Sequence, residues 1–166
     1  KGKSGQEWRL KLCDRRVASV VRAIQDLPGQ RLFQYLDERN SRHDIRSQDV
    51  NDYIRETAGP DFTSKHFRAW GATVAAALAL GEKDLPGSMR EQAMALNAVL
   101  DRVARMLRNT RAVCRKCYVH PRIIEAYLAG ELKLGPCRKP AGDPQKPGLR
   151  HEERQVLNFL GRRLRA

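Results

Sequence analysis

Apolar residues recur at every third or fourth position along most of the chain, which is the periodicity of an amphipathic α-helix. Residues that can cap helices, such as Asp14, Ser47 and Ser88, precede several of these stripes. Alanine dominates the second half of the third stripe, so we expect that helix to pack closely against its neighbours. The pattern predicts about seven helices, which span residues 15–27, 48–57, 65–80, 89–107, 114–118, 122–130 and 151–165.

The first 12 residues follow a different pattern. Residues 7–12 alternate between polar and apolar after a turn-like segment, as one strand of a β-hairpin does. The opposing strand would lie before Lys1. We therefore expect residues 1–12 to form a partial β-hairpin and residues 13–166 to form a helical domain, which makes the fold mainly α.

Three further segments interrupt the helical period. The short segment 32–36 could form a strand, and the polar segment 37–44 is typical of a turn. Residues 134–149 contain four of the eight prolines in the chain, a composition that indicates a loop or linker.

The chain is strongly basic. It has 166 residues, with 32 Lys and Arg against 19 Asp and Glu, which gives a formal net charge of +13 at pH 7. Arginine supplies most of the positive charge, and its planar guanidinium suits bidentate contacts with phosphate groups. The basic residues are spread along a patterned sequence and do not form a single arm. This charge predicts a nucleic-acid partner.

Two other classes of partner find little support in the sequence. No apolar run approaches the roughly 18 residues of a transmembrane helix, so we expect no membrane partner. The pair Cys114 and Cys117, with His120 three residues later, imitates part of a zinc site, but a second ligand pair is missing. We therefore expect reduced thiols and no bound metal, with His120 and Pro121 shaping the start of a helix.

Tyr118 lies in an unusually basic local sequence. Arg115 and Lys116 are close before it, and Arg108 and Arg111 precede them. A tyrosine with an ordinary pKa of about 10 is a poor nucleophile at neutral pH unless cations stabilise its phenolate. The arrangement suggests attack on a phosphodiester of DNA that the same cations hold. The alternative is a half-buried tyrosine of a helix with solvated cations around it.

The order of four segments resembles the catalytic domain of type IB DNA topoisomerases of the bacterial and poxvirus-like branch. Together they reach across almost the whole chain. The segments are the turn at 2–5, the stretch 25–35 after the first helix, the stretch 61–73, and the segment 109–121 around Tyr118.

The resemblance implies an enzyme that relaxes supercoiled duplex DNA. Tyr118 would attack one phosphodiester and form a 3′-phosphotyrosyl bond, after which the strand with the free 5′-hydroxyl would rotate and be resealed. Neither ATP nor a metal would be needed, because the covalent bond conserves the energy of the phosphodiester. The resemblance further implies a monomer that clamps DNA together with an N-terminal domain, in the cytoplasm at a bacterial nucleoid.

The resemblance also implies roles for individual residues. Arg68 matches an arginine that stabilises the charge developing on the phosphate oxygens. Asn109, nine residues before Tyr118, matches a His or Asn that donates a hydrogen bond to a non-bridging oxygen. Lys3 matches a lysine that protonates the leaving 5′-oxygen. Residues expected to contact DNA are Lys65, which matches a backbone-contacting position, and Arg115 and Lys116 beside the nucleophile.

Each of these roles has a structural alternative. Arg68 could be a solvated helix arginine, and Asn109 an ordinary residue at a helix end. Lys3 could be an exposed turn lysine, and Lys1 competes with it for the role of general acid.

The chain departs from the family pattern in two ways. A further arginine and a clamp domain are expected before Lys1, so we expect the chain alone to be impaired as an enzyme. Arg111 stands where many bacterial members have proline, which adds positive charge near the nucleophile.

Two other functions stay open. Tyrosine recombinases share the fold and the tyrosine chemistry, but they usually carry a His-x-x-Arg motif, and here His66 is one residue too close to Arg68. A helical DNA-binding module without enzymatic activity is equally compatible with the charge. Such a module would form no covalent adduct with DNA.

Overall fold

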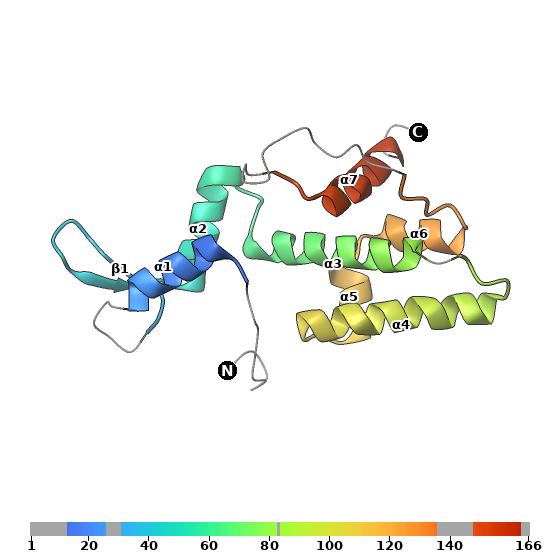
Figure 1. The fold of residues 1–166 in the computed structure, drawn as a ribbon, viewed down its shortest axis with the longest axis horizontal. Coiled ribbons are helices and arrows are strands. Elements are labelled where there is room, and N and C mark those ends of the chain that lie inside the picture. The colour runs from blue at the N-terminus through green and yellow to red at the C-terminus, as the bar shows by residue number, and fades with distance from the viewer. Residues whose placement is uncertain (1–12, 26–30, 83, 136–147, 164–166) are drawn as a thin grey trace. The chain divides into compact units, whose positions relative to one another are not determined.

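The computed structural model describes residues 13–25, 31–82, 84–135 and 148–163. The chain divides into two compact units, Lys1–Pro60 and Asp61–Ala166, each with its own secondary-structure elements (Figure 1). The fold is mainly α, as the sequence predicts, because the described residues form seven helices and one small antiparallel sheet. The predicted partial hairpin at residues 1–12, with Lys3, lies outside the described residues.

In the part of the first unit that the structure describes, there are two helices and two short strands: α1 (Arg15–Gln25), β1 (Gln34–Leu36), β2 (Arg42–Asp44) and α2 (Ser47–Ala58). Asp14 caps α1 as predicted, since its carboxylate accepts hydrogen bonds from the backbone N–H groups of Arg16 at 2.8 Å and Val17 at 3.2 Å. These two bonds, that from Val17 first, lower the pKa of Asp14 below its ordinary value.

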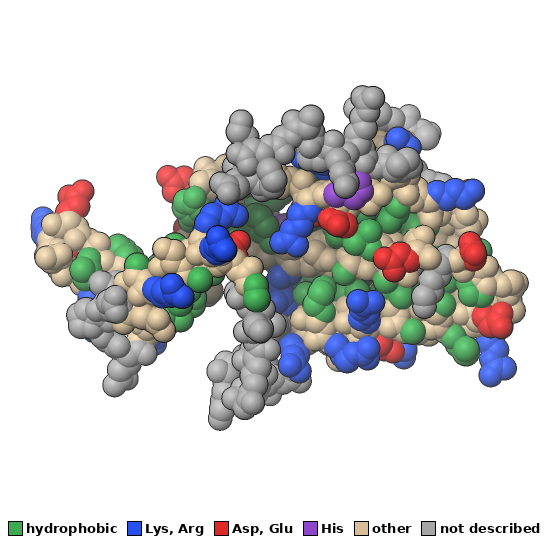
Figure 2. Space-filling model, viewed as in Figure 1, with side chains coloured by type: hydrophobic (Ala, Val, Ile, Leu, Met, Phe, Trp, Pro, Cys, Tyr) green, Lys and Arg blue, Asp and Glu red, His purple; other side chains and the backbone are tan. Residues whose placement is uncertain are grey.

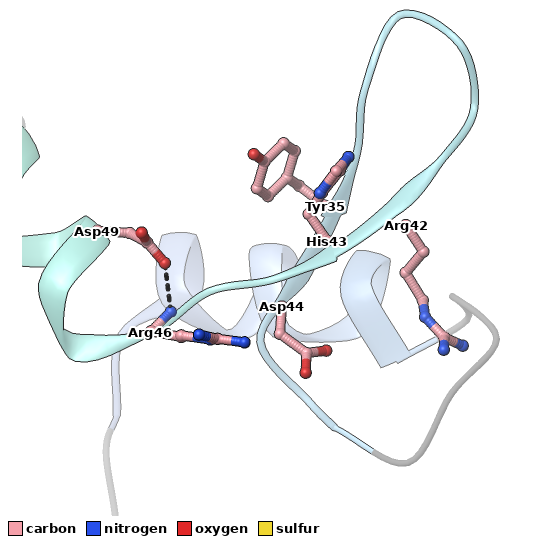
Figure 3. A pocket seen from close by; sticks show the side chains of 6 residues that line it. All are labelled: Tyr35, Arg42, His43, Asp44, Arg46 and Asp49. Atoms are coloured by element: carbon pink, nitrogen blue, oxygen red, sulfur yellow. Dashed lines mark hydrogen bonds between the residues drawn. The ribbon is translucent and has the colours of Figure 1, made fainter.

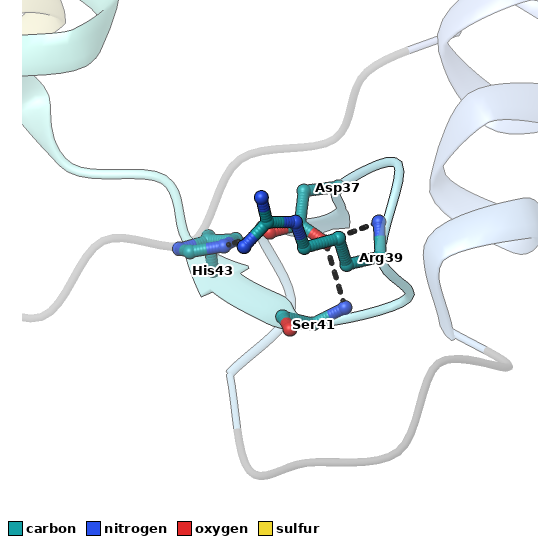
Figure 4. A network of polar contacts seen from close by, with 4 residues as sticks. All are labelled: Asp37, Arg39, Ser41 and His43. Carbon is teal, nitrogen blue, oxygen red and sulfur yellow. Dashed lines mark hydrogen bonds and ion pairs between the residues drawn. The ribbon is translucent and has the colours of Figure 1, made fainter.

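The two strands form a hairpin in which Tyr35 lies opposite His43. Asp37 closes its turn by accepting hydrogen bonds from the backbone N–H groups of Arg39 at 2.9 Å and Ser41 at 2.8 Å, while its second oxygen lies 2.8 Å from Nε2 of His43 (Figure 4). The prediction of a turn over the whole of 37–44 was therefore wrong, because the last three residues pair as β2. A strand of three residues is too short to show alternation.

The start of α2 lies one residue earlier than expected. Arg46, and not Ser47, is the N-cap residue, and its backbone N–H donates to the carboxylate of Asp49 at 2.6 Å. A carboxylate in the first turn thus holds the helix start in place of a cap hydroxyl. Beside it lies a polar depression of about 480 Å³ (Figure 3). Its lining residues are Tyr35, Arg42, His43, Asp44, Arg46 and Asp49.

Few side chains of the first unit are buried. Gln34 is the only buried residue among those described in this unit. Val20 of α1 is 61% exposed and Tyr53 of α2 is 66% exposed, although both lie on the apolar faces of their helices. The amphipathic patterns of α1 and α2 therefore predict these helices correctly. Among the described residues, however, the first unit has a much smaller buried core than the second unit.

The described residues of the second unit form five helices: α3 (Ser64–Gly81), α4 (Met89–Leu107), α5 (Arg111–Cys117), α6 (Pro121–Leu128) and α7 (His151–Arg163). Helix α3 contacts α4, α6 and α7 and is the central element of the unit. Its small side chains Ala72, Ala76 and Ala77 are completely buried. They allow the neighbouring helices to approach closely, which confirms the packing expected of the alanine-rich stripe.

Local signals account for the helix starts of the second unit. Ser88 begins α4 by accepting a hydrogen bond from the backbone N–H of Glu91 at 3.2 Å, as predicted. Pro121 occupies the first turn of α6, where a missing N–H costs nothing.

Trp70 of α3 donates through its indole N–H to Glu153 of α7 at 3.1 Å, which ties the last helix to the central one.

Candidate active site

Tyr118 lies at the C-terminal end of α5, half-buried against the core of the second unit. The helix begins at Arg111 because the hydroxyl of Thr110 accepts a hydrogen bond from the backbone N–H of Val113 at 3.3 Å. The helix predicted over residues 114–118 thus begins three residues earlier than expected. The backbone N–H of Tyr118 still donates to the carbonyl of Cys114 at 3.1 Å, so the last turn of α5 fixes the backbone of the tyrosine.

Arg68 lies beside Tyr118 although the two residues are far apart in the sequence. The guanidinium carbon of Arg68 lies over the tyrosine ring, 5.7 Å from its centroid. Nη2 of Arg68 donates to the carbonyl oxygen of Leu107 at 2.9 Å. The arginine on α3 therefore reaches the end of α4 and the end of α5 at once, and its orientation is fixed by the bond to Leu107.

Asn109 follows the end of α4, where the chain makes a sharp turn. Arg108 has φ 53° and ψ 47°, the left-handed conformation that usually belongs to glycine. The turn is closed by the backbone N–H of Asn109, which donates to the carbonyl of Ala104 at 2.9 Å. The structure thus brings Asn109 to the same end of α4 whose carbonyl at Leu107 binds Arg68.

The other predicted cations lie on exposed positions of the same elements. Lys65 is exposed on the first turn of α3, and Arg115 and Lys116 are exposed on the last turn of α5. Figure 2 shows Lys and Arg side chains along the side of the second unit where α4 lies. Lys3 is outside the described residues, so the structure does not place the predicted general acid.

Comparison with known proteins assigns the chain to a family. The family described as eukaryotic DNA topoisomerase I, catalytic core, matches residues 2–133. The chain belongs to this family. A DNA topoisomerase 1B of Acanthamoeba polyphaga mimivirus is 33% identical over 134 residues, which is 76% of this chain and 40% of that protein. The resemblance to type IB topoisomerases is thereby confirmed, while the viral relative gives no support to a bacterial origin.

Sequence reasoning missed Thr73. Its side chain is 4% exposed on α3, and its Oγ1 donates to the backbone carbonyl of Tyr118 at 3.1 Å. The same oxygen accepts a hydrogen bond from the backbone N–H of His120 at 3.0 Å. The available signal was a polar residue on the buried face of an alanine-rich helix.

Arg111, where many bacterial members of the family were expected to have proline, is paired. Its Nη1 lies 3.1 Å from Oδ2 of Asp101 on α4, and both side chains are about half exposed. The ion pair links the start of α5 to α4 and offsets part of the charge that Arg111 adds near the tyrosine.

The cysteine pair does not combine with His120 into a metal site. Cys114 is completely buried, and burial raises the pKa of its thiol, an effect that the charge of Arg68 opposes. Cys117 is exposed, and Nδ1 of His120 accepts a hydrogen bond from the backbone N–H of Arg122 at the start of α6. Within the described ranges, no cluster of three or more His, Cys, Asp or Glu could hold a metal ion. Among those same residues, no helix is both long and apolar enough to span a membrane.

Proposed function

We propose that this chain carries the DNA-relaxing centre of a type IB topoisomerase, which cuts one strand of duplex DNA through Tyr118 and reseals it. The observation that carries the proposal is the position of the Arg68 guanidinium, 5.7 Å from the centroid of the Tyr118 ring. Family membership supports DNA as the substrate. Because the chain spans 40% of the length of its viral relative, the activity of the whole protein is part of the proposal.

In the proposed reaction, the phenol oxygen of Tyr118 loses its proton to solvent water and attacks the phosphorus of one phosphodiester. A bond forms between this oxygen and phosphorus, and the bond from phosphorus to the 5′-oxygen breaks. The leaving oxygen takes a proton from a general acid, for which we propose Lys3. The strand that ends in the 5′-hydroxyl rotates, and the reverse steps reseal it. Since one phosphodiester is exchanged for another, neither ATP nor a metal is required.

The roles of Arg68 and Asn109 follow from the charge that this reaction creates. Negative charge grows on the non-bridging oxygens as the tyrosine attacks, and a preset guanidinium stabilises it without reorganising. The bond from Arg68 to the carbonyl of Leu107 at 2.9 Å supports such presetting. Asn109 follows at the same end of α4, and its side-chain amide can donate a hydrogen bond to a phosphate oxygen but cannot carry a proton.

The proposed DNA contacts are the exposed cations around the tyrosine. Lys65 lies on the helix that carries Arg68, and Arg115 and Lys116 lie on the helix that ends at Tyr118. We propose that the protein acts as a monomer that clamps the duplex with a further domain. On this view Lys3 supplies the acid, and the 166-residue chain alone is impaired.

The proposal is tested by incubating supercoiled plasmid without ATP and with a metal chelator. The 166-residue chain and the longest natural polypeptide that contains it are assayed in parallel. A short duplex, labelled at either the 5′ or the 3′ end of one strand, then identifies the linkage on a denaturing gel. A 3′-phosphotyrosyl bond retains the 5′-labelled fragment on the protein and releases the 3′-labelled one.

Tyr118→Phe is expected to abolish relaxation and adduct formation while DNA affinity stays nearly unchanged, because only the nucleophilic oxygen is lost. Tyr53→Phe, which removes a phenol that is 66% exposed on α2, serves as the matched control and should retain both activities. Residual nicking in Tyr118→Phe would refute the nucleophile. DNA binding without any adduct from the longer polypeptide would identify a helical binding module instead.

A further inference from the structure

The side chain of Thr73 connects α3 to the backbone on either side of Val119. Its hydroxyl donates to the carbonyl of Tyr118 at 3.1 Å and accepts from the N–H of His120 at 3.0 Å. The carbonyl belongs to the end of α5 and the N–H to the residue that caps α6, and both would lack a helical partner. One hydroxyl therefore satisfies a backbone donor and a backbone acceptor in the turn that carries the tyrosine.

Thr73 uses its hydroxyl differently from Thr57, another helical threonine of this chain. A threonine within a helix commonly donates to the carbonyl four residues earlier in its own helix. Thr57 of α2 does so, with its Oγ1 2.7 Å from the carbonyl of Tyr53. The hydroxyl of Thr73 instead bonds across to a segment 45 residues later in the chain.

The surroundings of Thr73 leave this turn little room to move. Thr73 is 4% exposed, and Ala72, Ala76 and Val119 around it are at most 3% exposed. Arg68 lies five residues earlier on the same helix, and its guanidinium lies over the Tyr118 ring. Helix α3 thus holds the arginine through its own backbone and the tyrosine through the hydroxyl of Thr73.

We propose that Thr73 is a positioning residue for the cleavage reaction. Its two hydrogen bonds hold the backbone on either side of Val119 and thereby set the distance between the Tyr118 phenol and Arg68. The inference rests on the proposed function and adds to it a residue that touches neither DNA nor the reacting atoms. Displacing a reacting group by about 1 Å can slow a reaction on the order of 100-fold, so a small shift of the α5–α6 turn is sufficient.

The test compares Thr73→Val, Thr73→Ser and Thr73→Ala in the longest natural polypeptide that contains the chain. Valine keeps the shape and removes the hydroxyl, whereas serine keeps the hydroxyl and loses a methyl group. Single-turnover cleavage of an end-labelled duplex gives the rate, fluorescence anisotropy gives the DNA affinity, and thermal unfolding gives the stability. Thr57→Val is the matched control, because it removes a hydroxyl that serves only its own helix.

Thr73→Val and Thr73→Ala are expected to cleave about 10- to 100-fold more slowly than the unchanged protein, with DNA affinity within about twofold. Thr73→Ser should recover most of the rate even though its loss of a methyl lowers stability. A purely structural role would instead make the rate follow stability, so that serine would do no better than valine. If Thr73→Val does not unfold cooperatively, the cleavage rates of Thr73→Ala and Thr73→Ser are compared with their stabilities in the same way, and this comparison decides between the two roles.

The failure of this inference differs from the failure of the proposed function. If the unchanged protein forms a Tyr118 adduct and Thr73→Val or Thr73→Ala forms it at the same rate, only the positioning role is overturned. If the unchanged protein forms no adduct, the proposed function is overturned and the positioning role with it.

Discussion

At the scale of single residues, Arg68 makes contacts of two kinds. Its Nη2 donates to the carbonyl of Leu107 at 2.9 Å, and its guanidinium carbon lies 5.7 Å from the centroid of the Tyr118 ring. The first contact supports the structure, and the second places a cation where the proposed reaction builds negative charge. Substitutions at this position should separate the two contributions.

Arg68→Ala is expected to slow cleavage by a factor of about 10² to 10³, since the loss of one preset donor to a developing oxyanion costs about 3 to 4 kcal/mol. Arg68→Lys keeps the charge but loses the planar fork and should recover only part of the rate. Single-turnover cleavage measures both. Arg55→Ala on α2, which removes an ion pair with Asp52 at 2.7 Å, is the control. A normal rate in Arg68→Ala would remove Arg68 from the site.

Arg108 stores backbone strain beside Asn109. A non-glycine residue at φ 53° is disfavoured, so Arg108→Gly should raise the free energy of unfolding by about 1 kcal/mol or less. Gly130→Ala should lower it, because Gly130 has φ 70° and a Cβ there would lie 3.3 Å from Cδ2 of Leu85. Urea unfolding tests both. A loss of stability in Arg108→Gly would show that the arginine side chain contributes more than its strain costs.

At the scale of elements, local signals predict some boundaries and miss others. The bounds predicted for α4, residues 89–107, agree with Met89–Leu107 because Ser88 caps the helix. The start of α5 was placed too late because Thr110 was not recognised as its cap. The strand β2 was missed because its three residues carry no hydrophobic pattern. They pair with β1 across the turn that Asp37 closes.

The hairpin of the first unit should weaken in acid. The hydrogen bond to His43, followed by that from the backbone of Ser41, lowers the pKa of Asp37 below 3.8. A lowered pKa in the folded state means that the carboxylate stabilises the hairpin above about pH 3.8, and that this contribution is lost as pH falls through the lower folded value. The amide signals of Arg39 and Ser41 in an NMR titration should therefore shift with a midpoint below 3.8.

Asp37→Asn is the control for this titration, since its amide oxygen can still accept from the turn but does not ionise in this range. The acid transition of both amide signals should disappear in the variant. A midpoint at or above 3.8 in the unchanged protein would contradict the role of Asp37 in the turn.

At the scale of the whole molecule, the formal charge of +13 should govern DNA binding. The logarithm of the binding constant is expected to fall linearly with the logarithm of salt concentration. Binding releases counterions from the DNA phosphates, and a higher salt concentration opposes that release. Lys65→Ala and Lys116→Ala should each reduce the slope by about 1. Lys133→Ala, which removes an exposed lysine after α6 that has no proposed DNA contact, should leave it unchanged. A flat salt response would contradict binding through phosphates.

The sequence alone determined the helical class, most helix spans and the identity of the candidate tyrosine, because periodicity, caps and local charge are properties of neighbouring residues. Its resemblance to type IB topoisomerases also selected Arg68 and Asn109. Only the tertiary structure decided that the guanidinium of Arg68 lies over the Tyr118 ring and that Thr73 bonds to the turn after α5. Both contacts join residues 45 or more positions apart, and they depend on how closely α3, α4 and α5 pack, which no local pattern specifies.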